Sequence, residues 1–460
     1  MELNEIKSVY FVGAGGIGMS ALERYFLAKG INVGGYDRVA TELTRALEAE
    51  GAQLHYEDSV SLIGEQFKDK SSTLVVYTPA IPADHTELNY FLSGGFMVHK
   101  RAEVLGIISR SYKALCVAGT HGKTTTTSMT AHLLEQSSVK CSAFLGGITK
   151  NYNTNYLFDA KSPYVVVEAD EFDRSFHQLT PWATVITATD ADHLDIYGTE
   201  EAYLESFSKY TTLIQPGGAL VMHTGLKMQP APQPGVKVYT YSREAGDFHA
   251  ENVRIGNGEI VFDYVSPLGN ISDVSLGVPV SINIENGIAA LALAQLAGAG
   301  ADELKRAMAS FSGVVRRFDF KVKNQDHVVL SDYAHHPAEI HQCVESLKEV
   351  FGGRKITAIF QPHLYTRTRD FYQDFADSLS LFDEVVLTEI YPAREKPIEG
   401  VSSQLIYDNL RPGVEKHMIE KHTVLDFVKA HPTDVLVVLG AGDLDDYTQR
   451  IADTVTGGCR

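Results

Sequence analysis

The feature that most constrains this chain is a short loop rich in glycine and threonine, Gly119-Thr120-His121-Gly122-Lys123-Thr124-Thr125. An apolar run over 114–118 precedes the loop, and a helix-prone segment over 126–135 follows it. Strand, glycine loop and helix in this order predict a nucleotide-binding loop, because backbone N–H groups, the helix N-terminus and the lysine ammonium all attract phosphate. The hydroxyl of Thr124 is predicted to bind Mg²⁺. Val117 stands where the common form of the motif has its first glycine, so the loop is a shorter variant.

Length and element order predict an α/β protein of several domains. A chain of 460 residues corresponds to about three domains of ~150 residues each. In the first third, strand-like runs at 8–12, 31–36 and 73–77 alternate with helical segments, which indicates a parallel sheet. Between 236 and 280 the extended runs are short and separated by turns, and they predict a small antiparallel β insertion.

A second glycine-rich turn follows the first predicted strand. Gly13, Gly15 and Gly18 match the G-x-G-x-x-G pattern of dinucleotide-binding folds, and Asp37 ends the second strand, where a ribose-binding acid is expected. Taken alone, this pattern suggests an oxidoreductase that uses NAD. The same geometry serves any pyrophosphate, and glycines here can also serve only the close packing of a helix on a strand. The ligand of this turn therefore stays open on the pattern alone.

Two acidic clusters follow strand-like runs in the middle third. The run at 164–167 ends in Glu168-Ala169-Asp170-Glu171-Phe172-Asp173, and the run at 183–188 ends in Asp190-Ala191-Asp192-His193-Leu194-Asp195. Both clusters are expected at the carboxyl edge of the sheet, beside the phosphate loop, where carboxylate oxygens suit Mg²⁺. His193 is a less usual Mg²⁺ ligand and can instead be a hydrogen-bonded structural residue.

The last third places polar side chains after four strand-like runs, at 328–331, 356–360, 384–388 and 435–439. A purely structural sheet rarely ends so many strands in histidines, arginines and acids. This edge is therefore predicted to be a site, although each histidine or arginine alone can be a solvated loop residue.

Composition excludes several classes of protein. The formal net charge of −18 argues against a general binder of nucleic acid, which needs a basic face. The cysteines (Cys116, Cys141, Cys343 and Cys459) are far apart and lack metal-ligand spacing, so free thiols in a reducing compartment are expected. The polar N-terminus does not resemble a signal peptide, and no apolar run reaches the ~18 residues that span a bilayer. A cytoplasmic protein without a membrane partner is expected.

Together these motifs resemble those of the Mur ligases of peptidoglycan synthesis, and the resemblance extends from end to end of the chain. The matching elements are Gly15-Gly16-Ile17-Gly18-Met19-Ser20-Ala21-Leu22, Arg101-Ala102-Glu103, the Gly119–Thr125 loop, Glu168-Ala169-Asp170-Glu171, Asp192-His193-Leu194-Asp195, Asn283 with Asn286, Arg316-Arg317-Phe318, Asp332-Tyr333-Ala334-His335-His336-Pro337 and Gln361-Pro362-His363. The Gly-Ile-Gly-Met-Ser-Ala element is similar to that of the alanine-adding members. The family commonly has arginine at the position of Leu364, which is a departure.

The resemblance implies three domains: a Rossmann-like domain over 1–106 that binds the UDP part of the substrate, a P-loop-type ATP-binding domain over 107–315, and a second Rossmann-like domain over 316–460. It implies that ATP phosphorylates the lactyl carboxylate of UDP-N-acetylmuramate and that the amine of L-alanine attacks the acyl phosphate. ATP and Mg²⁺ are the implied cofactors, and the chain is expected to be a monomer or homodimer. The alternatives are a related ligase that adds a recycled tripeptide and an NAD-dependent oxidoreductase.

The resemblance also implies roles for single residues around ATP. Lys123 resembles the phosphate-binding lysine of the family, and Asn283 and Asn286 resemble residues that face the adenine. Arg317 and Asp332 resemble contacts of the third domain to the γ-phosphate and the ribose. The implied metal ligands are Thr124, Glu168 and His193.

The remaining implied roles concern the two other substrates. The residues matched to UDP-substrate binding are Gly15, Gly16, Ile17, Gly18, Asp37 and Arg101. Those matched to the incoming amino acid are Tyr333, His335, His363 and Arg367. His335 is the candidate acceptor of the amine's proton, and Arg317 and Arg367 join Lys123 and His335 as expected catalytic residues.

Overall fold

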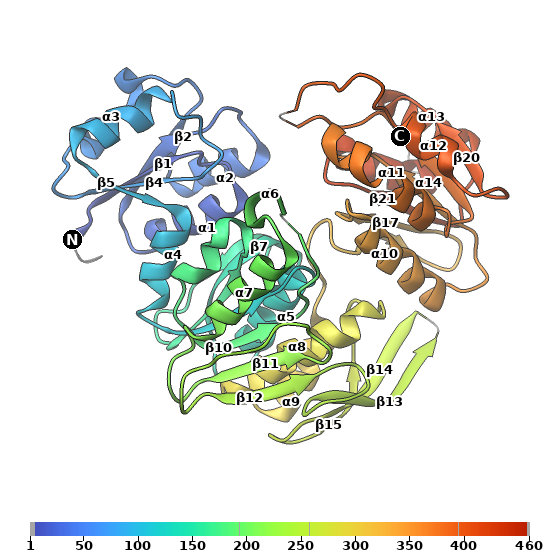
Figure 1. Ribbon diagram of the computed structural model, residues 1–460, viewed down its shortest axis with the longest axis horizontal. Helices are drawn as coiled ribbons and strands as arrows, with labels where there is room; N and C mark the ends of the chain where they lie inside the picture. Colours follow the sequence, from blue (N-terminus) through green and yellow to red (C-terminus); the bar gives the residue numbers. More distant parts are fainter. Residues whose placement is uncertain (1–4, 193, 257, 394, 458–460) are drawn as a thin grey trace. The chain divides into compact units, whose positions relative to one another are not determined.

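The computed structural model describes residues 5–192, 194–256, 258–393 and 395–457. The chain forms two compact units (Figure 1). The first comprises Met1–Glu251, Asp263–Ser272 and Asn286–Ser310, and the second comprises Asn252–Phe262, Asp273–Glu285 and Phe311–Arg460. Each unit is an α/β assembly, in agreement with the predicted class. His193, a predicted metal ligand, lies outside the described residues.

The first unit begins with a five-stranded parallel sheet in the order β3-β2-β1-β4-β5. Its strands are β1 (Ser8–Val12), β2 (Asn32–Tyr36), β3 (Gln53–His55), β4 (Thr73–Tyr77) and β5 (Met97–Lys100). Its helices are α1 (Ile17–Ala28), α2 (Glu42–Glu50), α3 (Thr86–Gly94) and α4 (Arg101–Ser109). Val9 and Phe11 belong to the core that contains α1, whereas Tyr10 and Val12 belong to the core that contains α3. Both faces of β1 are thus buried, which explains the apolar run from Val9 to Val12.

The central sheet of the first unit has seven strands in the order β12-β11-β10-β6-β9-β7-β8. All neighbours are parallel except β7 and β8. The strands are β6 (Lys113–Ala118), β7 (Ser142–Thr149), β8 (Thr154–Leu157), β9 (Tyr164–Ala169), β10 (Pro181–Ile186), β11 (Ala219–His223) and β12 (Lys237–Tyr241). The helices are α5 (Lys123–Glu135), α6 (Leu194–Tyr197), α7 (Glu200–Thr211), α8 (Ile282–Leu296) and α9 (Ala301–Ser310).

A separate three-stranded sheet forms the β insertion, with the order β13-β14-β15. Its strands are β13 (His249–Gly256), β14 (Glu259–Val265) and β15 (Ile271–Ser275). The predicted start of the insertion at 236 is wrong, because β12 continues the central sheet in parallel with β11. Short extended runs between turns look alike whether they extend an existing sheet or form a new one, so the sequence could not separate them.

The second unit contains a six-stranded sheet in the order β16-β17-β21-β18-β19-β20, parallel except for β16. Its strands are β16 (Asp319–Lys323), β17 (Val328–Asp332), β18 (Ile356–Phe360), β19 (Glu384–Leu387), β20 (Glu415–Met418) and β21 (Val435–Leu439). Its helices are α10 (Pro337–Val350), α11 (Tyr365–Leu379), α12 (Gln404–Asn409), α13 (Val424–Ala430) and α14 (Thr448–Val455). Separate apolar cores lie on its two faces.

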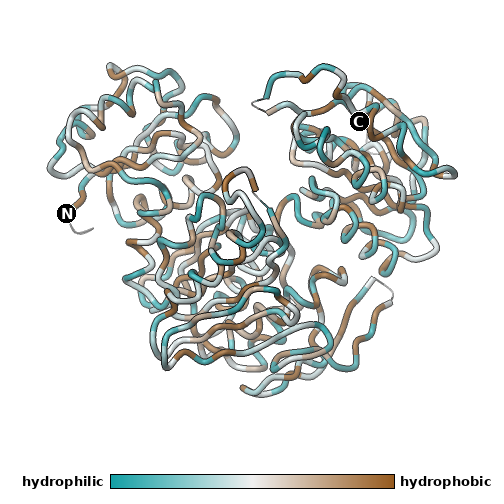
Figure 2. Tube along the Cα trace, viewed as in Figure 1, coloured by the Kyte–Doolittle hydropathy of each residue, from teal (hydrophilic) through white to brown (hydrophobic). Residues whose placement is uncertain are grey.

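Hydropathy along the chain follows this layering. In Figure 2 the strongly hydrophobic residues gather in the sheet strands, and the loops between elements are mainly hydrophilic. Every residue of β1, β17, β18 and β21 is buried. Among the described residues, no helix has the length and apolar character needed to cross a membrane.

Candidate active site

The phosphate loop connects β6 to α5 and has two glycines in the left-handed backbone region. Gly119 has a φ of 133° and Gly122 a φ of 78°. A Cβ at Gly119 would lie 2.1 Å from Thr187 Oγ1, so no other residue fits there without a shift of the chain. Thr187 follows β10 and donates to the carbonyl of His121 at 2.5 Å. The loop is therefore fastened to the neighbouring strand end, and α5 begins directly at Lys123.

The ammonium of Lys123 is held across this loop by a buried acid. Lys123 Nζ lies 2.9 and 2.8 Å from the two carboxylate oxygens of Glu171 and 2.6 Å from the carbonyl oxygen of Gly119. Burial disfavours the lysine charge, but the neighbouring carboxylates, chiefly Glu171, outweigh it and raise the pKa of Lys123. Burial also raises the pKa of Glu171, to about 7, against the opposing influence of Lys123. The lysine therefore stays charged at neutral pH.

Two of the predicted metal ligands are brought together beside the loop. Thr124, at the start of α5, donates through Oγ1 to Glu168 Oε1 at 3.1 Å. Glu168 lies in β9, and a Cβ at Gly146 of β7 would lie 2.1 Å from its Oε2. Gly146 thus leaves the space that this carboxylate occupies. A hydroxyl and a carboxylate next to a phosphate loop form the oxygen donor set that Mg²⁺ prefers, so the residues present fit the ion.

The other loop residues are fixed by the chain around them. Thr120 Oγ1 lies 2.7 Å from the carbonyl oxygen of Asp190 and 2.9 Å from the hydroxyl of Tyr203. His121 Nε2 is 3.8 Å from the carboxylate of Asp190. These contacts join the loop to the second acidic cluster.

Asn286 on α8 also touches the phosphate loop. Thr126 donates to its Oδ1 at 3.2 Å, and a Cβ at Gly122 would lie 2.7 Å from the same oxygen. Asn283, one turn earlier, donates through Nδ2 to the carbonyl of Val278 at 3.1 Å. The adenine contacts implied for both asparagines stay predictions.

A pocket of about 260 Å³ extends from the N-terminal glycine turn to Glu168. Ile17 and Gly18 contribute the first turn of α1, and Arg101 contributes the first residue of α4. The remaining lining residues are Ala21, Leu105, Phe144, Leu145, Gly146, Glu168 and Asp170. Of the residues predicted for the UDP substrate and the metal, the structure therefore brings Ile17, Gly18, Arg101 and Glu168 around one cavity.

The N-terminal glycine turn is organised by Asp37. The N–H of Gly15 donates to Asp37 Oδ2 at 2.7 Å, and the N–H of Val39 donates to Oδ1 at 3.2 Å. Arg101 packs beside Gly18, since a Cβ there would lie 3.0 Å from its Nη1, and its guanidinium is 3.4 Å from Asp170. Asp37 thus shapes the turn itself, while the ribose contact expected of it stays a prediction.

A fully buried asparagine of β8 clamps the start of α1. Asn155 Nδ2 donates to the carbonyl of Ile17 at 2.6 Å and to Ser20 Oγ at 2.9 Å. Its Oδ1 accepts from Arg24 at 2.5 Å. This clamp fixes the helix end that lines the pocket.

The second unit gathers most of the predicted amino-acid residues at the carboxyl ends of β17 and β18. The ring centroids of Tyr333 and His335 are 5.1 Å apart, and those of His335 and His363 are 6.0 Å apart. Arg317 Cζ lies 5.0 Å from the centre of the Tyr333 ring. Arg367 lies on α11, and its charge is near enough to lower the pKa of His335.

Burial is the main cause of the pKa shifts of Asp332 and His335. Burial raises the pKa of Asp332 to about 6, although Arg317 and two backbone N–H donors oppose the rise. Burial lowers the pKa of His335 below its ordinary value, with Glu339 opposing. His335 Nδ1 lies 2.9 Å from the carbonyl oxygen of Tyr333, so a neutral ring donates there and keeps Nε2 as a proton acceptor.

Three strained backbone positions lie in the same part of the second unit. Arg316 (φ 65°), Phe318 (φ 42°) and Leu364 (φ 72°) adopt positive φ without being glycine. Arg316 is bonded to the carbonyls of Gly440 and Gly442, at 3.0 and 3.1 Å. Such strain persists only where the surroundings impose it, and here it orients the residues on either side.

Sequence reasoning assigned no role to Glu171, Thr187, Gly146 or Asn155. Glu171 stands within the quoted acidic cluster, so its position was a usable signal. The other three lie outside any motif, and only the tertiary contacts described above reveal them.

Family models match three consecutive parts of the chain. The Mur ligase family catalytic domain matches residues 8–113, the Mur ligase middle domain matches 117–294, and the glutamate ligase domain of Mur ligases matches 316–442. The chain belongs to the Mur ligase family.

Relatives within the family match 98% of this chain. The UDP-N-acetylmuramate–L-alanine ligase of Phocaeicola vulgatus is 66% identical over 451 residues, with 98% of each chain covered. The enzyme of the same name from Parabacteroides distasonis is 58% identical over 454 residues, again with 98% of each covered. The solved UDP-N-acetylmuramate–alanine ligase of Thermotoga maritima is 29% identical with a TM-score of 0.82, covering 98% of this chain and 100% of that one.

Proposed function

We propose that this protein is an ATP-dependent ligase that joins L-alanine to the lactyl carboxylate of UDP-N-acetylmuramate. The products are ADP, phosphate and the UDP-N-acetylmuramoyl-alanine amide. Relatives at 66% and 58% identity bear the name of this activity. The observation that carries the proposal is the pocket that connects Gly18 and Arg101 to Glu168.

The lining of this pocket suits a substrate with two anionic ends. At one end, the N-terminus of α1 and the guanidinium of Arg101 favour the diphosphate of a nucleotide sugar. At the other end, Glu168 is hydrogen-bonded to Thr124 of the phosphate loop. A carboxylate placed near Glu168 is then next to the transferable phosphate of ATP.

Thr124 and Glu168 would hold Mg²⁺, with His193 as the further proposed ligand. The ion, when bound, offsets the negative charge of the phosphates and the carboxylate. Lys123 supplies the protein's own charge to the transferred phosphoryl group, because its ammonium lies at the loop. Phosphorylation converts an unreactive carboxylate into an acyl phosphate, whose phosphate is a good leaving group.

The second step consumes the amine of L-alanine. The amine nitrogen forms a bond to the acyl carbon, the carbon–oxygen bond to phosphate breaks, and one proton leaves the nitrogen. We assign this proton to Nε2 of His335, which is neutral because burial lowers its pKa. Tyr333, His363 and Arg367 are the proposed contacts to the amino acid, and Arg317 and Asp332 the proposed contacts to ATP.

The setting of the reaction follows from its substrates. ATP and nucleotide sugars are made in the cytoplasm, so we place the enzyme there, without nucleic acid or membrane partners. A monomer or a homodimer satisfies the chemistry equally.

The test is a product assay by mass spectrometry with UDP-N-acetylmuramate, MgATP and one acceptor at a time. The acceptors are L-alanine, glycine, L-serine and the tripeptide L-alanyl-γ-D-glutamyl-meso-diaminopimelate. We expect amide formation and phosphate release with L-alanine, lost in Lys123→Ala and retained in Lys161→Ala, a control at an exposed lysine. Product with the tripeptide alone, or NADH oxidation without ligation, would overturn the proposal.

A further inference from the structure

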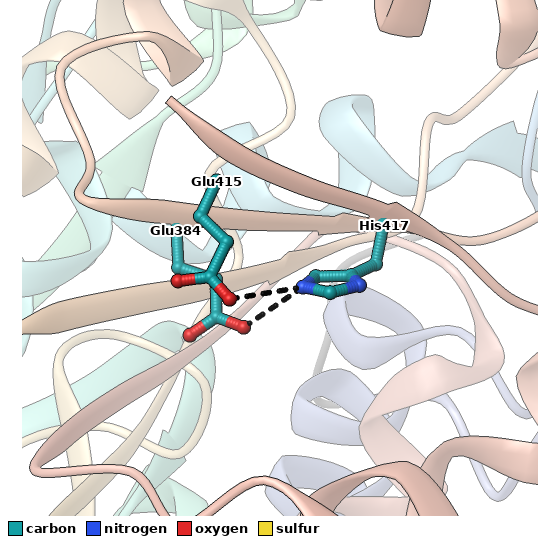
Figure 3. Close-up of side chains that lie close together, drawn as sticks. All are labelled: Glu384, Glu415 and His417. Atoms are coloured by element: carbon teal, nitrogen blue, oxygen red, sulfur yellow. Dashed lines mark ion pairs between the residues drawn. The ribbon is translucent and has the colours of Figure 1, made fainter. Parts of the chain in front are cut away.

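A group of metal-ligating side chains lies on the C-terminal sheet. Among the described residues, Glu384, Glu415 and His417 are the group whose possible ligand atoms all lie within 4.8 Å of one another. Glu384 starts β19, and Glu415 and His417 belong to β20 (Figure 3). All three lie within the second unit.

The strand register explains why these side chains meet. β19 and β20 are parallel, and Glu384 pairs with Glu415 while Val386 pairs with His417. Side chains two residues apart in a strand point to the same face, so Glu415 and His417 share a face with their neighbour Glu384. Figure 3 shows both carboxylates directed toward the imidazole.

The distances between the possible ligand atoms are similar to those between the ligands of a single tetrahedral metal ion. His417 Nε2 lies 3.2 Å from Glu384 Oε1 and 3.5 Å from Glu415 Oε1. Tetrahedral ligands at bond lengths of ~2.0–2.1 Å are about 3.3–3.4 Å apart, as at zinc sites with histidine and carboxylate ligands. His417 Nε2 is buried and makes no hydrogen bond of normal geometry. These distances would allow the nitrogen and both Oε1 atoms to bind one ion.

The other carboxylate oxygens are already engaged. Lys355 Nζ lies 2.9 Å from Glu384 Oε2 and 2.8 Å from Glu415 Oε2, and Thr357 donates to Glu384 Oε2 at 3.0 Å. Outer donors of this kind orient ligating carboxylates. Lys355 cancels one of the two carboxylate charges and leaves one negative charge beside the imidazole, which favours a dication.

Two aromatic rings also pack against the imidazole of His417. The ring of Phe427 contacts His417 edge-on with a centroid distance of 5.0 Å, and the ring of His431 lies at 5.4 Å. Glu384 is almost fully buried, with 3% of its side chain exposed. A ligand set that is rigid before binding loses little entropy on binding.

We propose that Glu384, Glu415 and His417 bind one divalent transition-metal ion of the zinc type, with water in the open position. Imidazole nitrogen selects such an ion over Mg²⁺ or Ca²⁺, which prefer oxygen donors alone. The ion ties the edge strand β20 to β19, at the opposite side of the sheet from β16. The alternative is a proton in place of the metal. A protonated His417 would then form ion pairs with Glu384 and Glu415.

Isothermal titration of the full chain with ZnCl₂ tests the proposal. The protein is first treated with chelator and then kept with excess Mg²⁺ and a non-hydrolysable ATP analogue, so that the nucleotide site does not take up zinc. We expect one zinc site, weakened at least roughly tenfold in His417→Gln because a ligand is lost. The matched control is His422→Gln, since His422 pairs with Glu420 at 3.2 Å on the surface and belongs to no triad.

Two further measurements keep the test decisive. Co²⁺ in place of zinc should give the intense visible bands of a tetrahedral site in the parent and in His422→Gln, and should not in His417→Gln. If His417→Gln fails to fold, Glu415→Gln replaces it, because that side chain is half exposed. Absence of a zinc site in the parent, or equal zinc affinity in the triad variants and the control, would overturn the proposal and favour the protonated network.

Discussion

Replacing Asn155 by alanine tests whether the clamp on α1 prepares the substrate pocket. The side chain is completely buried and makes three hydrogen bonds, to Ile17 O, Ser20 Oγ and Arg24 Nη1. Truncation removes all three at once and leaves the rest of β8 in place. The first turn of α1, which contributes Ile17 and Gly18 to the pocket, then loses its fixed contact with β8.

The loss of folding free energy in Asn155→Ala can be estimated for each hydrogen bond in turn. The two neutral bonds contribute about 1 kcal/mol each, and the bond to the guanidinium about 1.5–3 kcal/mol. Part of this is recovered, because Arg24 keeps its ion pair with Glu50 at 2.7 Å and Ser20 Oγ still donates to the carbonyl of Ile17 at 2.9 Å. We therefore expect a net loss of about 2–4 kcal/mol, or roughly 5–10 °C in Tm for a cooperative unit of this size.

Calorimetry supplies both readouts of this prediction. Scanning calorimetry should show the lower Tm, and isothermal titration should show UDP-N-acetylmuramate binding weakened about tenfold, or about 1.4 kcal/mol. Affinity for an ATP analogue should be unchanged, because the phosphate loop does not touch Asn155. The matched control is Asn32→Ala, whose exposed amide makes only long bonds of 3.3 and 3.5 Å.

The reasoning fails if Asn155→Ala melts with the parent and binds the nucleotide sugar equally well. It also fails if ATP affinity falls as much as sugar affinity, because the effect would then be general loosening. Asn155→Asp adds a check, since it keeps the acceptor for Arg24 but faces the carbonyl of Ile17 with an oxygen, and it should be no better than alanine.

Four other changes have defined outcomes. Lys123→Ala should lower kcat at least ~10³-fold, and it should also lower Tm because it leaves the buried Glu171 without its partner; near-normal turnover would remove the lysine from catalysis. Gly146→Ala places a Cβ 2.1 Å from Glu168 Oε2 and should shift the Mg²⁺ dependence of the rate upward; an unchanged Mg²⁺ titration contradicts this. Burial lowers the pKa of His132 to about 4 from 6.5, so its contribution to stability is full above pH 6.5 and is lost as pH falls to about 4, by about 3 kcal/mol. Urea unfolding should show that the free energy of unfolding of His132→Gln falls less than that of the parent between pH 6.5 and about 4. Because burial also lowers the pKa of His335, the acid limb of kcat should lie below the ordinary histidine value and vanish in His335→Asn.

The strands were the most predictable part of the fold. Strands β1, β4, β18 and β21 have the predicted bounds, because each is a mainly apolar run closed by a glycine or a polar residue. The expected strand at 183–188 instead covers Pro181–Ile186. Thr187 and Ala188 look strand-like in sequence, but they pack on the phosphate loop, where Thr187 bonds to His121.

Helix starts were less predictable than strands. α5 begins at Lys123, three residues before the predicted start, because Gly122 in the left-handed region turns the chain directly into the helix. A run of threonines has low intrinsic helix propensity, so the sequence alone argues for a later start. Tertiary packing overrides that preference, since Thr126, Thr127 and Thr130 are fully buried.

Within the candidate site, the motifs predicted which charged residues take part. They did not predict which residues from distant elements contact one another. Lys123 and Glu168 were found through their motifs, whereas the Lys123–Glu171 pair depends on the loop after β9 returning to the start of α5. The clamp by Asn155 likewise joins residues more than a hundred positions apart. Such contacts are decided by sheet order and helix packing, which local patterns do not encode.

The charge balance of the pocket connects the acidic composition of the chain with the proposed Mg²⁺ ion. Arg101 is the cationic lining residue, and it faces Glu168 and Asp170. An anionic substrate that enters this pocket therefore meets an excess of negative charge, and Lys123 is already paired with Glu171. In the proposed reaction the missing positive charge would come with the nucleotide, as Mg²⁺ held by Thr124 and Glu168, which lie within hydrogen-bond distance of each other. With the proposed Mg²⁺ ion, a chain of net charge −18 would bind its anionic substrates without a basic surface.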